Sequence, residues 1–268
     1  YISLSYATLV CGNCLNFIII PIVSATWTPP LYAWYPCNMS ISICYWSCYL
    51  HQSTGFLTIG AVHVACETLV TGFILQICAQ LEVLNHRVLS INLKIQNLAL
   101  REKDKNKIFL YESFLTNACI TDHNSILKFA ELLSETFLQV LFIQFCASLS
   151  VIGTSIYLLT TIKVYSADFV ITTLYLICLL NQMLLYCWYS NQVLLNSREL
   201  FRSIYNTDWI TLHSKTQKTL LLMMLMASSP IQLFKGAIIK VNLDAFLNVL
   251  KFSYSAFNIL KNPSKDLN

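Results

Sequence analysis

Charged residues are scarce in this chain, and their absence is most complete at its start. Only 11% of the 268 residues are Asp, Glu, Lys or Arg, whereas soluble domains carry about 25%. No charged residue precedes Glu67, 56% of the residues are hydrophobic, and the mean hydropathy is +0.59. These values exclude a soluble domain and a nucleic-acid-binding protein, and they predict an integral membrane protein.

The motifs of targeting and catalysis are missing as well. The chain begins with Tyr1 rather than Met and lacks the basic stretch of a cleavable signal peptide, so we expect an N-terminal piece to precede it. It has no nucleophile elbow, no phosphate-binding loop and no paired carboxylates on an intramembrane face. We therefore predict that the protein is not an enzyme and uses no cofactor.

Two short clusters have the residue types of metal ligands. They are Cys11-Gly-Asn-Cys14 and His63-Ala-Val-Cys66 with Glu67. Neither has a second ligand pair at zinc-finger spacing, and lone thiols and histidines in apolar helices usually serve packing. We predict no metal site. Glu67 is a costly charge within a span, so we expect it to be paired, protonated or next to a hydrated crevice.

Apolar regions long enough to cross a bilayer dominate the chain. A span needs roughly 20 residues, and five regions qualify, the last of them an interrupted region at 219–260. Loops 82–131 and 196–218 carry eleven basic residues. The positive-inside rule places these two loops in the cytoplasm and the C-terminus outside. The predicted spans are 1–22, 53–81, 132–160, 169–195 and 236–260.

The predicted outer loop 23–52 carries features of an extracellular segment. Asn38-Met39-Ser40 is the only N-glycosylation sequon, so Asn38 is a candidate glycosylation site. Most of the eleven cysteines lie in apolar runs as small hydrophobes, but Cys37, Cys44 and Cys48 lie in or beside this loop. One disulfide can form among these three, and the sequence leaves the pairing open.

The last apolar region ends in polar residues at helical spacing. Intervals of four, three, four and three place them on one face of an α-helix. One interpretation is an ion path, in which amides and hydroxyls replace part of an ion's hydration. The alternative is hydrogen bonding to adjacent helices, although two ionisable residues within a span favour function. The residues are Asp244, Asn248, Lys251, Ser255 and Asn258.

The order of several short segments gives a family resemblance. No segment is a strict motif, but in their order and spacing they resemble the insect odorant receptors. The resemblance extends over the whole chain and is closest in its C-terminal third. The segments are Asp122-His123 leading into Ile126-Leu127, Tyr205-Asn-Thr-Asp-Trp209, Pro230-Ile231 and Phe252-Ser-Tyr-Ser-Ala-Phe257.

The resemblance implies an all-α membrane fold with seven spans, a cytoplasmic N-terminus and an extracellular C-terminus. Five of these spans lie in the chain, as one transmembrane domain over residues 1–268. The family's last helix is split, and Pro230 with Lys235-Gly236 marks the break here. A cytoplasmic anchor, where four subunits meet, is expected from parts of 82–131, 196–218 and 219–234.

The function that the resemblance implies is an odorant-gated, non-selective cation channel in the plasma membrane of a sensory neuron dendrite. The expected partners are a volatile odorant, the lipid bilayer and the family's co-receptor in a heterotetramer. Tyr254 and Asn258 align with gate positions, whereas the charge of Lys251 suits a cation pore only if it is paired or faces a subunit interface. The expected pore lining is Asn248, Lys251, Tyr254, Ser255 and Asn258.

An odorant pocket is expected between the outer halves of the spans, because the family's pocket lies among its second, third, fourth and sixth spans. Such pockets are lined by apolar and aromatic side chains with a few polar groups. For each single residue, core packing is the alternative role. The candidates are Phe17, Phe56, Gly60, Phe169, Thr172, Thr173 and Leu176.

Two other functions stay open from the sequence. A gustatory receptor of the same superfamily shares the architecture, but it tends to end in Thr-Tyr, five hydrophobic residues and Gln-Phe, where this chain has Ser253-Tyr-Ser-Ala-Phe257. A secondary transporter binds solute between repeats on broken helices. The break at Pro230 fits a transporter, but no second broken helix or inverted repeat accompanies it.

Overall fold

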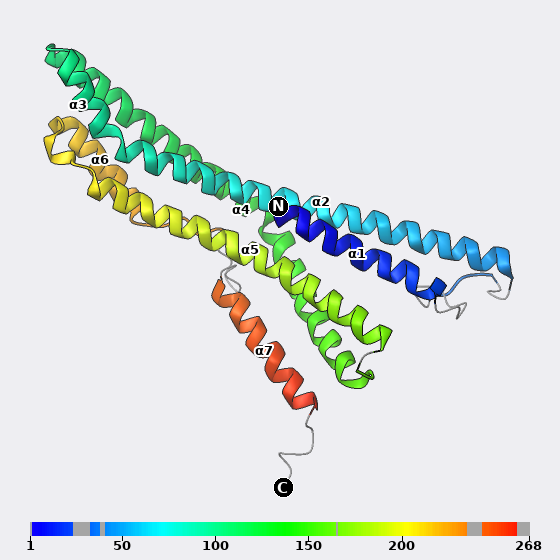
Figure 1. Ribbon diagram of the computed structural model, residues 1–268. Helices are drawn as coiled ribbons and strands as arrows, with labels where there is room; N and C mark the ends of the chain where they lie inside the picture. Colours follow the sequence, from blue (N-terminus) through cyan, green and yellow to red (C-terminus); the bar gives the residue numbers. More distant parts are fainter. Residues whose placement is uncertain (1, 24–32, 38–40, 165, 235–242, 262–268) are drawn as a thin grey trace, which may run out of the picture. The chain divides into compact units, whose positions relative to one another are not determined.

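The protein is helical over nearly all of the part that the structure describes. The computed structural model describes residues 2–23, 33–37, 41–164, 166–234 and 243–261. Figure 1 shows the helices in order, from α1 in blue to α7 in red. Their bounds are α1 (Ile2–Val23), α2 (Ser42–Leu89), α3 (Ile91–Arg101), α4 (Lys105–Thr161), α5 (Ala167–Asn206), the short 3₁₀ helix η1 (Trp209–Thr211), α6 (Ser214–Ala227) and α7 (Leu243–Lys261).

Three helical stretches of the described chain are long and apolar enough to cross a membrane. They are Ser42–Arg101, which joins α2 and α3, Lys105–Thr161 and Asp168–Asn206; Leu4–Ile19 is a shorter apolar helix. No proline occurs between Pro36 and Pro230, so every residue between them can donate to the helix ladder. The predicted all-α membrane architecture is confirmed. The count of five spans and their orientation stay predictions.

The helices extend beyond the predicted spans. α2 runs from Ser42 to Leu89, whereas the predicted span covers 53–81. α4 and α5 likewise continue through much of the charged segments 82–131 and 196–218. Lys, Arg, Glu and Leu are good helix formers, so charge alone does not end a helix. α6 ends at Ala227, short of the predicted 234, and α7 begins in the described chain at Leu243.

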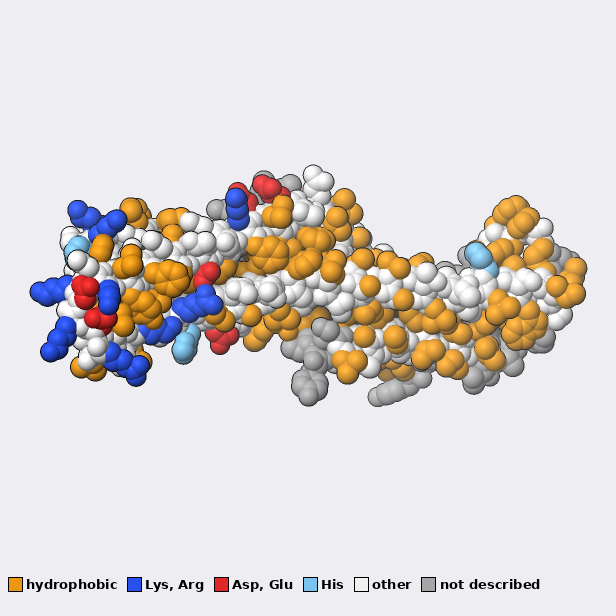
Figure 2. All heavy atoms as spheres, turned by 90° about the horizontal axis from the view of Figure 1, so that it is seen from above, with side chains coloured by type: hydrophobic (Ala, Val, Ile, Leu, Met, Phe, Trp, Pro, Cys, Tyr) orange, Lys and Arg blue, Asp and Glu red, His pale blue; other side chains and the backbone are white. Residues whose placement is uncertain are grey.

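The chain divides into two compact units, which we describe separately. Unit 1 contains residues 1–70, 145–185 and 247–268, and unit 2 contains residues 71–144 and 186–246. Only seven charged residues lie in unit 1, and all the others lie in unit 2. Figure 2 shows Lys and Arg side chains gathered at the end of unit 2 that carries α3 and α6. Unit 1 therefore has the composition expected of the membrane interior.

A stripe of buried residues along α2 and α3 forms the core of unit 2. Its members recur at alternating intervals of three and four, the spacing of helices that pack as in a coiled coil. α5 contributes the buried Leu200 and Ile204, and α6 contributes the buried Leu220 and Met223. The stripe consists of Ile74, Ile77, Leu81, Leu84, Val88, Ile91 and Ile95.

Polar contacts hold the segment that follows α6 within unit 2. The backbone N–H of Ile231 donates to Ser197 Oγ of α5 at 3.0 Å, and that of Phe234 donates to Ser134 Oγ of α4 at 3.2 Å. Phe234 is fully buried and has a φ of 52°, in the left-handed region that larger residues rarely adopt. These contacts attach residues 231–234 to α4 and α5.

A buried histidine in unit 2 is expected to make the stability of this unit depend on pH. His123 of α4 lies outside the predicted span 132–160 and is nearly inaccessible to solvent, and burial lowers the pKa of its imidazole. Its contribution to stability is present above the unfolded pKa of about 6.5 and is lost as pH falls through the lower folded pKa. We expect the melting temperature of the detergent-solubilised protein to fall between pH 7.5 and pH 5.5.

The His123→Leu variant should lose most of that fall in melting temperature. His86→Leu, which replaces an exposed histidine of the same unit, is the control and should retain it. An unchanged pH dependence in His123→Leu would show that another group carries the effect.

Candidate functional site

α7 has two faces of opposite character. Phe246 and Val249 are buried, and Ser253 and Phe257 are half-buried. About 3.6 residues make a turn, so these four share one side of the helix and the predicted polar face lies on the other side. All five predicted pore residues are exposed, Tyr254 by 70%. They are Asn248, Lys251, Tyr254, Ser255 and Asn258.

The length and the first turn of α7 also suit a membrane. The helix has 19 residues, which gives about 28 Å at 1.5 Å per residue, close to the hydrocarbon thickness of about 30 Å. The exposed Asp244 lies in its first turn, where a carboxylate interacts favourably with the helix dipole. α7 therefore presents a polar stripe, over the depth of a bilayer, that the described helices of its own chain leave uncovered.

Three of the predicted pocket residues meet where α1 and α2 cross in unit 1. The rings of Phe17 and Phe56 stack with centroids 5.6 Å apart and an interplanar angle of 11°. One helical turn along α2, a Cβ on Gly60 would lie 2.8 Å from Cys14 Sγ. A larger residue at position 60 would therefore require the Cys14 side chain to shift. Phe17, Phe56 and Gly60 are each half-buried.

The other four predicted pocket residues occupy the first turns of α5. Phe169, Thr172, Thr173 and Leu176 are all half-buried. The hydroxyl of Thr172 donates to the backbone oxygen of Asp168, and that of Thr173 to the backbone oxygen of Phe169, both at 2.7 Å. Their own helix thus uses the donor of each hydroxyl, and each hydroxyl oxygen can still accept a hydrogen bond. The pocket itself stays a prediction.

A polar cluster crosses unit 1 among α1, α2 and α5. Glu67 of α2 is 6% exposed and accepts a hydrogen bond from Gln182 Nε2 of α5 at 2.5 Å. His63 Nδ1 lies 4.0 Å from Glu67 Oε1, and His63 Nε2 lies 3.1 Å from the hydroxyl of Tyr6 on α1. Glu67 is thus paired, which is one of the three alternatives expected from the sequence.

Sequence reasoning missed the partners in this polar cluster. Tyr6 and Gln182 are 1% and 4% exposed. A glutamine within an apolar run was the available signal for Gln182, since an amide buried among helices needs a hydrogen-bond partner. Cys66 lies close to His63 and Glu67 in the sequence. In the structure, however, Cys66 is exposed whereas Glu67 is buried.

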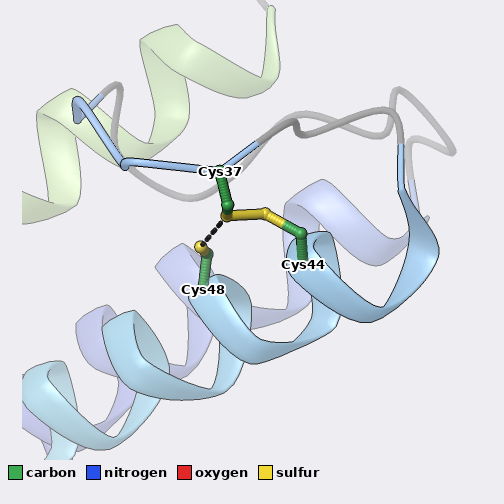
Figure 3. Close-up of side chains that lie close together, drawn as sticks. All are labelled: Cys37, Cys44 and Cys48. Carbon is green, nitrogen blue, oxygen red and sulfur yellow. Dashed lines mark hydrogen bonds between the residues drawn. A yellow bond between two sulfur atoms is a disulfide. The ribbon is translucent and has the colours of Figure 1, made fainter.

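Two of the three cysteines at and before the start of α2 form the disulfide whose pairing the sequence left open. Cys37 is bonded to Cys44, and Cys48 Sγ lies 3.9 Å from Cys37 Sγ (Figure 3). The three sulfur atoms lie close enough together to hold a metal ion, but those of Cys37 and Cys44 are bonded to each other, so only Cys48 has a free thiol. The candidate glycosylation site Asn38 lies outside the described residues.

A chain whose described part is mostly helical, with several helices of membrane-spanning length, is a multi-pass membrane protein. It belongs to the odorant receptor family, because the family model described as 7tm odorant receptor matches residues 1–254. The resemblance inferred from the short segments is confirmed, and the match favours the odorant interpretation over the gustatory one. Members of this family are receptors, which confirms the prediction that the chain is not an enzyme.

Individual relatives support the same assignment. Odorant receptor 46a, isoform B, of Drosophila melanogaster is 25% identical over 261 residues, which cover 96% of this chain and 66% of that protein. Odorant receptor Or1 of Anopheles gambiae is 22% identical over 253 residues, which cover 88% of this chain and 61% of that protein. The chain therefore spans slightly less than two thirds of the length of these relatives.

A solved structure shares the fold. The insect olfactory receptor OR5 from Machilis hrabei, in complex with eugenol, matches with a TM-score of 0.81 and 15% identity. The match covers 98% of this chain and 66% of that one. The same receptor in a structure described without eugenol matches with a TM-score of 0.82. At such low identity, the likeness establishes the fold of this chain as that of an insect olfactory receptor.

Proposed function

We propose that the chain is a subunit of an odorant-gated, non-selective cation channel in the plasma membrane. The polar face of α7 lines part of the ion path, and the subunit works with the family's co-receptor in a heterotetramer. The observation that carries the proposal is the orientation of α7, whose polar residues are exposed while its opposite face packs within the chain.

The energetic argument concerns what covers the exposed face of α7. A charged side chain at the centre of a bilayer costs roughly 3 kcal/mol on insertion scales. Lys251 would carry this cost if it faced lipid tails when α7 spans the membrane. Water or neighbouring subunits relieve that cost. A ring of subunits whose α7 helices face one another supplies both, since it encloses a hydrated path lined by Asn248, Ser255 and Asn258.

The ligand in this proposal is a small organic odorant that binds among α1, α2 and α5. The stacked pair Phe17 and Phe56 supplies aromatic surface, and the half-buried start of α5 supplies more apolar wall. The related OR5 from Machilis hrabei is solved in complex with eugenol, a small organic ligand. An odorant that binds more tightly to the open arrangement shifts the population of channels toward it.

Whole-cell current recordings from cells that express the intact receptor test the proposal. Cells expressing the subunit with and without the co-receptor are exposed to an odorant panel under G-protein blockade. We expect an odorant-evoked cation current that needs both subunits, and we expect Tyr254→Ala and Asn258→Ala to change its ion selectivity. Asn124→Ala, at an exposed asparagine of α4, is the control and should leave selectivity unchanged.

Silence across a broad panel despite surface expression would contradict the proposal. Labelled solute uptake without current would instead favour a transporter. If Tyr254→Ala, Asn258→Ala and Asn124→Ala all have the ion selectivity of the wild type, the protein is a channel whose ion path avoids the polar face of α7.

Lys251 gives a second prediction for the same recordings. Its exposed ammonium lies on the proposed path and repels cations, at about 1 kcal/mol for unit charges 4 Å apart in water. We expect Lys251→Gln to raise single-channel cation conductance by roughly fivefold or less. Lys163→Gln, at an exposed lysine beyond the end of α4, is the control. Unchanged conductance in Lys251→Gln would place the Lys251 side chain away from the path.

A further inference from the structure

Three cysteine sulfurs lie together at and before the start of α2. Cys37 and Cys44 form a disulfide, and Cys48 has a free thiol about one helical turn further along α2 (Figure 3). The three sulfur atoms lie within 4.8 Å of one another, and Cys48 Sγ is 3.9 Å from Cys37 Sγ. A free thiol beside a disulfide is the arrangement that thiol–disulfide exchange requires.

Cys37 is the sulfur that the other two cysteines can share. Cys44 and Cys48 are four residues apart on α2, so they lie on one face with Cβ atoms about 5 to 6 Å apart. A disulfide needs Cβ atoms about 3.5 to 4.5 Å apart, so a bond between Cys44 and Cys48 would distort the helix. Cys37 precedes α2 in a non-helical segment. It can therefore pair with either of two cysteines that lie one turn apart.

The burial of the three residues favours a reaction within the cluster. Cys48 is 6% exposed, whereas Cys37 is exposed and Cys44 is half-buried. Reagents in water therefore reach the thiol of Cys48 poorly, but the disulfide sulfur of Cys37 already lies next to it. A bond of about 2.05 Å requires these two sulfurs to approach by roughly 2 Å, which changes of rotamer can supply. The same rotations have to bring the Cys48 sulfur into line with the bond that breaks.

We propose that Cys37, Cys44 and Cys48 form a thiol–disulfide exchange site, which attaches the segment before α2 to either of two turns of that helix. The thiolate of Cys48 attacks Cys37 Sγ and forms a bond to it. The bond between Cys37 and Cys44 breaks, and Cys44 leaves as a thiolate that takes up the proton released by Cys48. One disulfide and one thiol remain, so the step needs no oxidant or reductant.

The exchange shifts the segment that carries Cys37 along α2. Two contacts hold this segment on the face of α2 that carries Cys44, Cys48 and His51. They are the disulfide and the hydroxyl of Tyr35, which lies 3.4 Å from His51 Nδ1. Four residues separate the two alternative partners, which is about 6 Å along the helix axis. Moving the bond to Cys48 therefore brings Cys37 toward His51, and we expect it to displace Tyr35 from its present contact.

The two attachments concern the part of unit 1 where the odorant pocket is predicted. The segment with Cys37 belongs to the connection between α1 and α2, the helices that carry the stacked rings of Phe17 and Phe56. Tyr49 of α2 donates a hydrogen bond to the backbone oxygen of Ile18, so this part of α2 packs beside Phe17. We expect the two attachments to differ in odorant sensitivity, and this last step rests on the proposed function.

Trapping of Cys44 tests the exchange in the full-length receptor, purified under non-reducing conditions. A charged maleimide is the probe, because it labels thiols in contact with water and reaches the buried Cys48 poorly. A second, isotopically distinct maleimide in denaturant then blocks the remaining thiols. Chymotrypsin cuts after Tyr45 and Trp46, which separates Cys44 from Cys48 for mass spectrometry. We expect the probe to accumulate on Cys44 over minutes to hours, as is usual for uncatalysed disulfide rearrangement, together with peptides that link Cys37 to Cys48.

Three variants identify the attacking thiol. Cys48→Ala removes it and should abolish the labelling of Cys44. Cys66→Ser is the matched control, because Cys66 is an exposed free thiol of the same helix, and it should leave the labelling unchanged. Cys44→Ser leaves Cys48 as the partner of Cys37 and should contain the disulfide between these two residues.

Three results would overturn the exchange site. The first needs no variant: Cys44 of the wild type stays unlabelled, and every linked peptide joins Cys37 to Cys44. The second is labelling of Cys44 that persists in Cys48→Ala, which means that another thiol attacks the disulfide. The third is labelling that Cys66→Ser abolishes, which means that exposed thiols of separate molecules exchange.

The trapping requires no ionic current, so it separates this site from the channel proposal. Trapping as expected without odorant-evoked current keeps the exchange site and rejects the proposed function. Odorant-evoked current without trapping does the reverse. When both succeed, Cys48→Ala and Cys44→Ser, each fixed in one attachment, should give odorant dose-response curves with different midpoints. Equal midpoints would reject the effect on odorant sensitivity.

Discussion

Replacing Gln182 by leucine is expected to destabilise unit 1 by about 2 to 3 kcal/mol, because it removes a hydrogen-bond donor from the buried carboxylate of Glu67. For a protein of this size, such a loss lowers the melting temperature by roughly 4 to 12 °C. Size-exclusion chromatography of the detergent-solubilised receptor after heating measures the change. The size of the effect follows from Glu67 being 6% exposed in a unit with few other charges.

A double variant separates the carboxylate from simple packing. Replacing Glu67 and Gln182 together by leucine removes the group that needs a partner, so most of the lost stability should return. Asn181→Leu, at the neighbouring half-buried amide of α5, is the matched single control and should have a smaller effect. If Gln182→Leu alone is as stable as the wild type, the carboxylate of Glu67 does not depend on this bond.

Truncating Phe234 to alanine should have the largest effect on unit 2. Its side chain is fully buried, and removing a buried phenylalanine costs about 3 to 5 kcal/mol. The residue also holds the turn after α6, where its N–H donates to Ser134 Oγ. We expect Phe234→Ala to lower the yield of monodisperse receptor and to reduce surface expression severalfold.

Phe114→Ala provides the comparison, because Phe114 of α4 is 67% exposed in the same unit. Its effect should stay within about 0.5 kcal/mol. Because Phe234→Ala is expected to leave little folded protein to melt, Phe234→Leu serves as the measurable variant, and its melting temperature should fall between those of Phe234→Ala and Phe114→Ala. Equal melting temperatures for Phe234→Leu and the wild type would contradict the role assigned to this side chain.

The sequence predicts the membrane class and the faces of α7 because both follow from local patterns. Scarce charge and long apolar runs indicate a membrane protein, and the spacing of Asn248, Ser255 and Asn258 places them on one helical face whatever surrounds it. The structure adds that this face is the exposed one. Spacing alone could not distinguish an exposed stripe from one that hydrogen-bonds to a neighbouring helix.

Such local patterns do not predict contacts between distant parts of the chain. Gln182 and Glu67 are 115 residues apart, and only the packing of α2 against α5 brings them together. Helix bounds were missed for a different reason, since favourable helix formers continue α2, α4 and α5 through segments whose charge suggested loops.

The bond between Cys37 and Cys44 has a consequence for how the protein is made. Disulfides form in the lumen of the endoplasmic reticulum and not in the cytosol. This bond can therefore form only if the start of α2 reaches the lumenal side of the membrane during synthesis. We expect it to close as a local event, because its two cysteines are seven positions apart. A thiol-reactive tag that gains access to Cys44 only after reduction would thus report the topology of the nascent chain, before any ligand or second subunit is present.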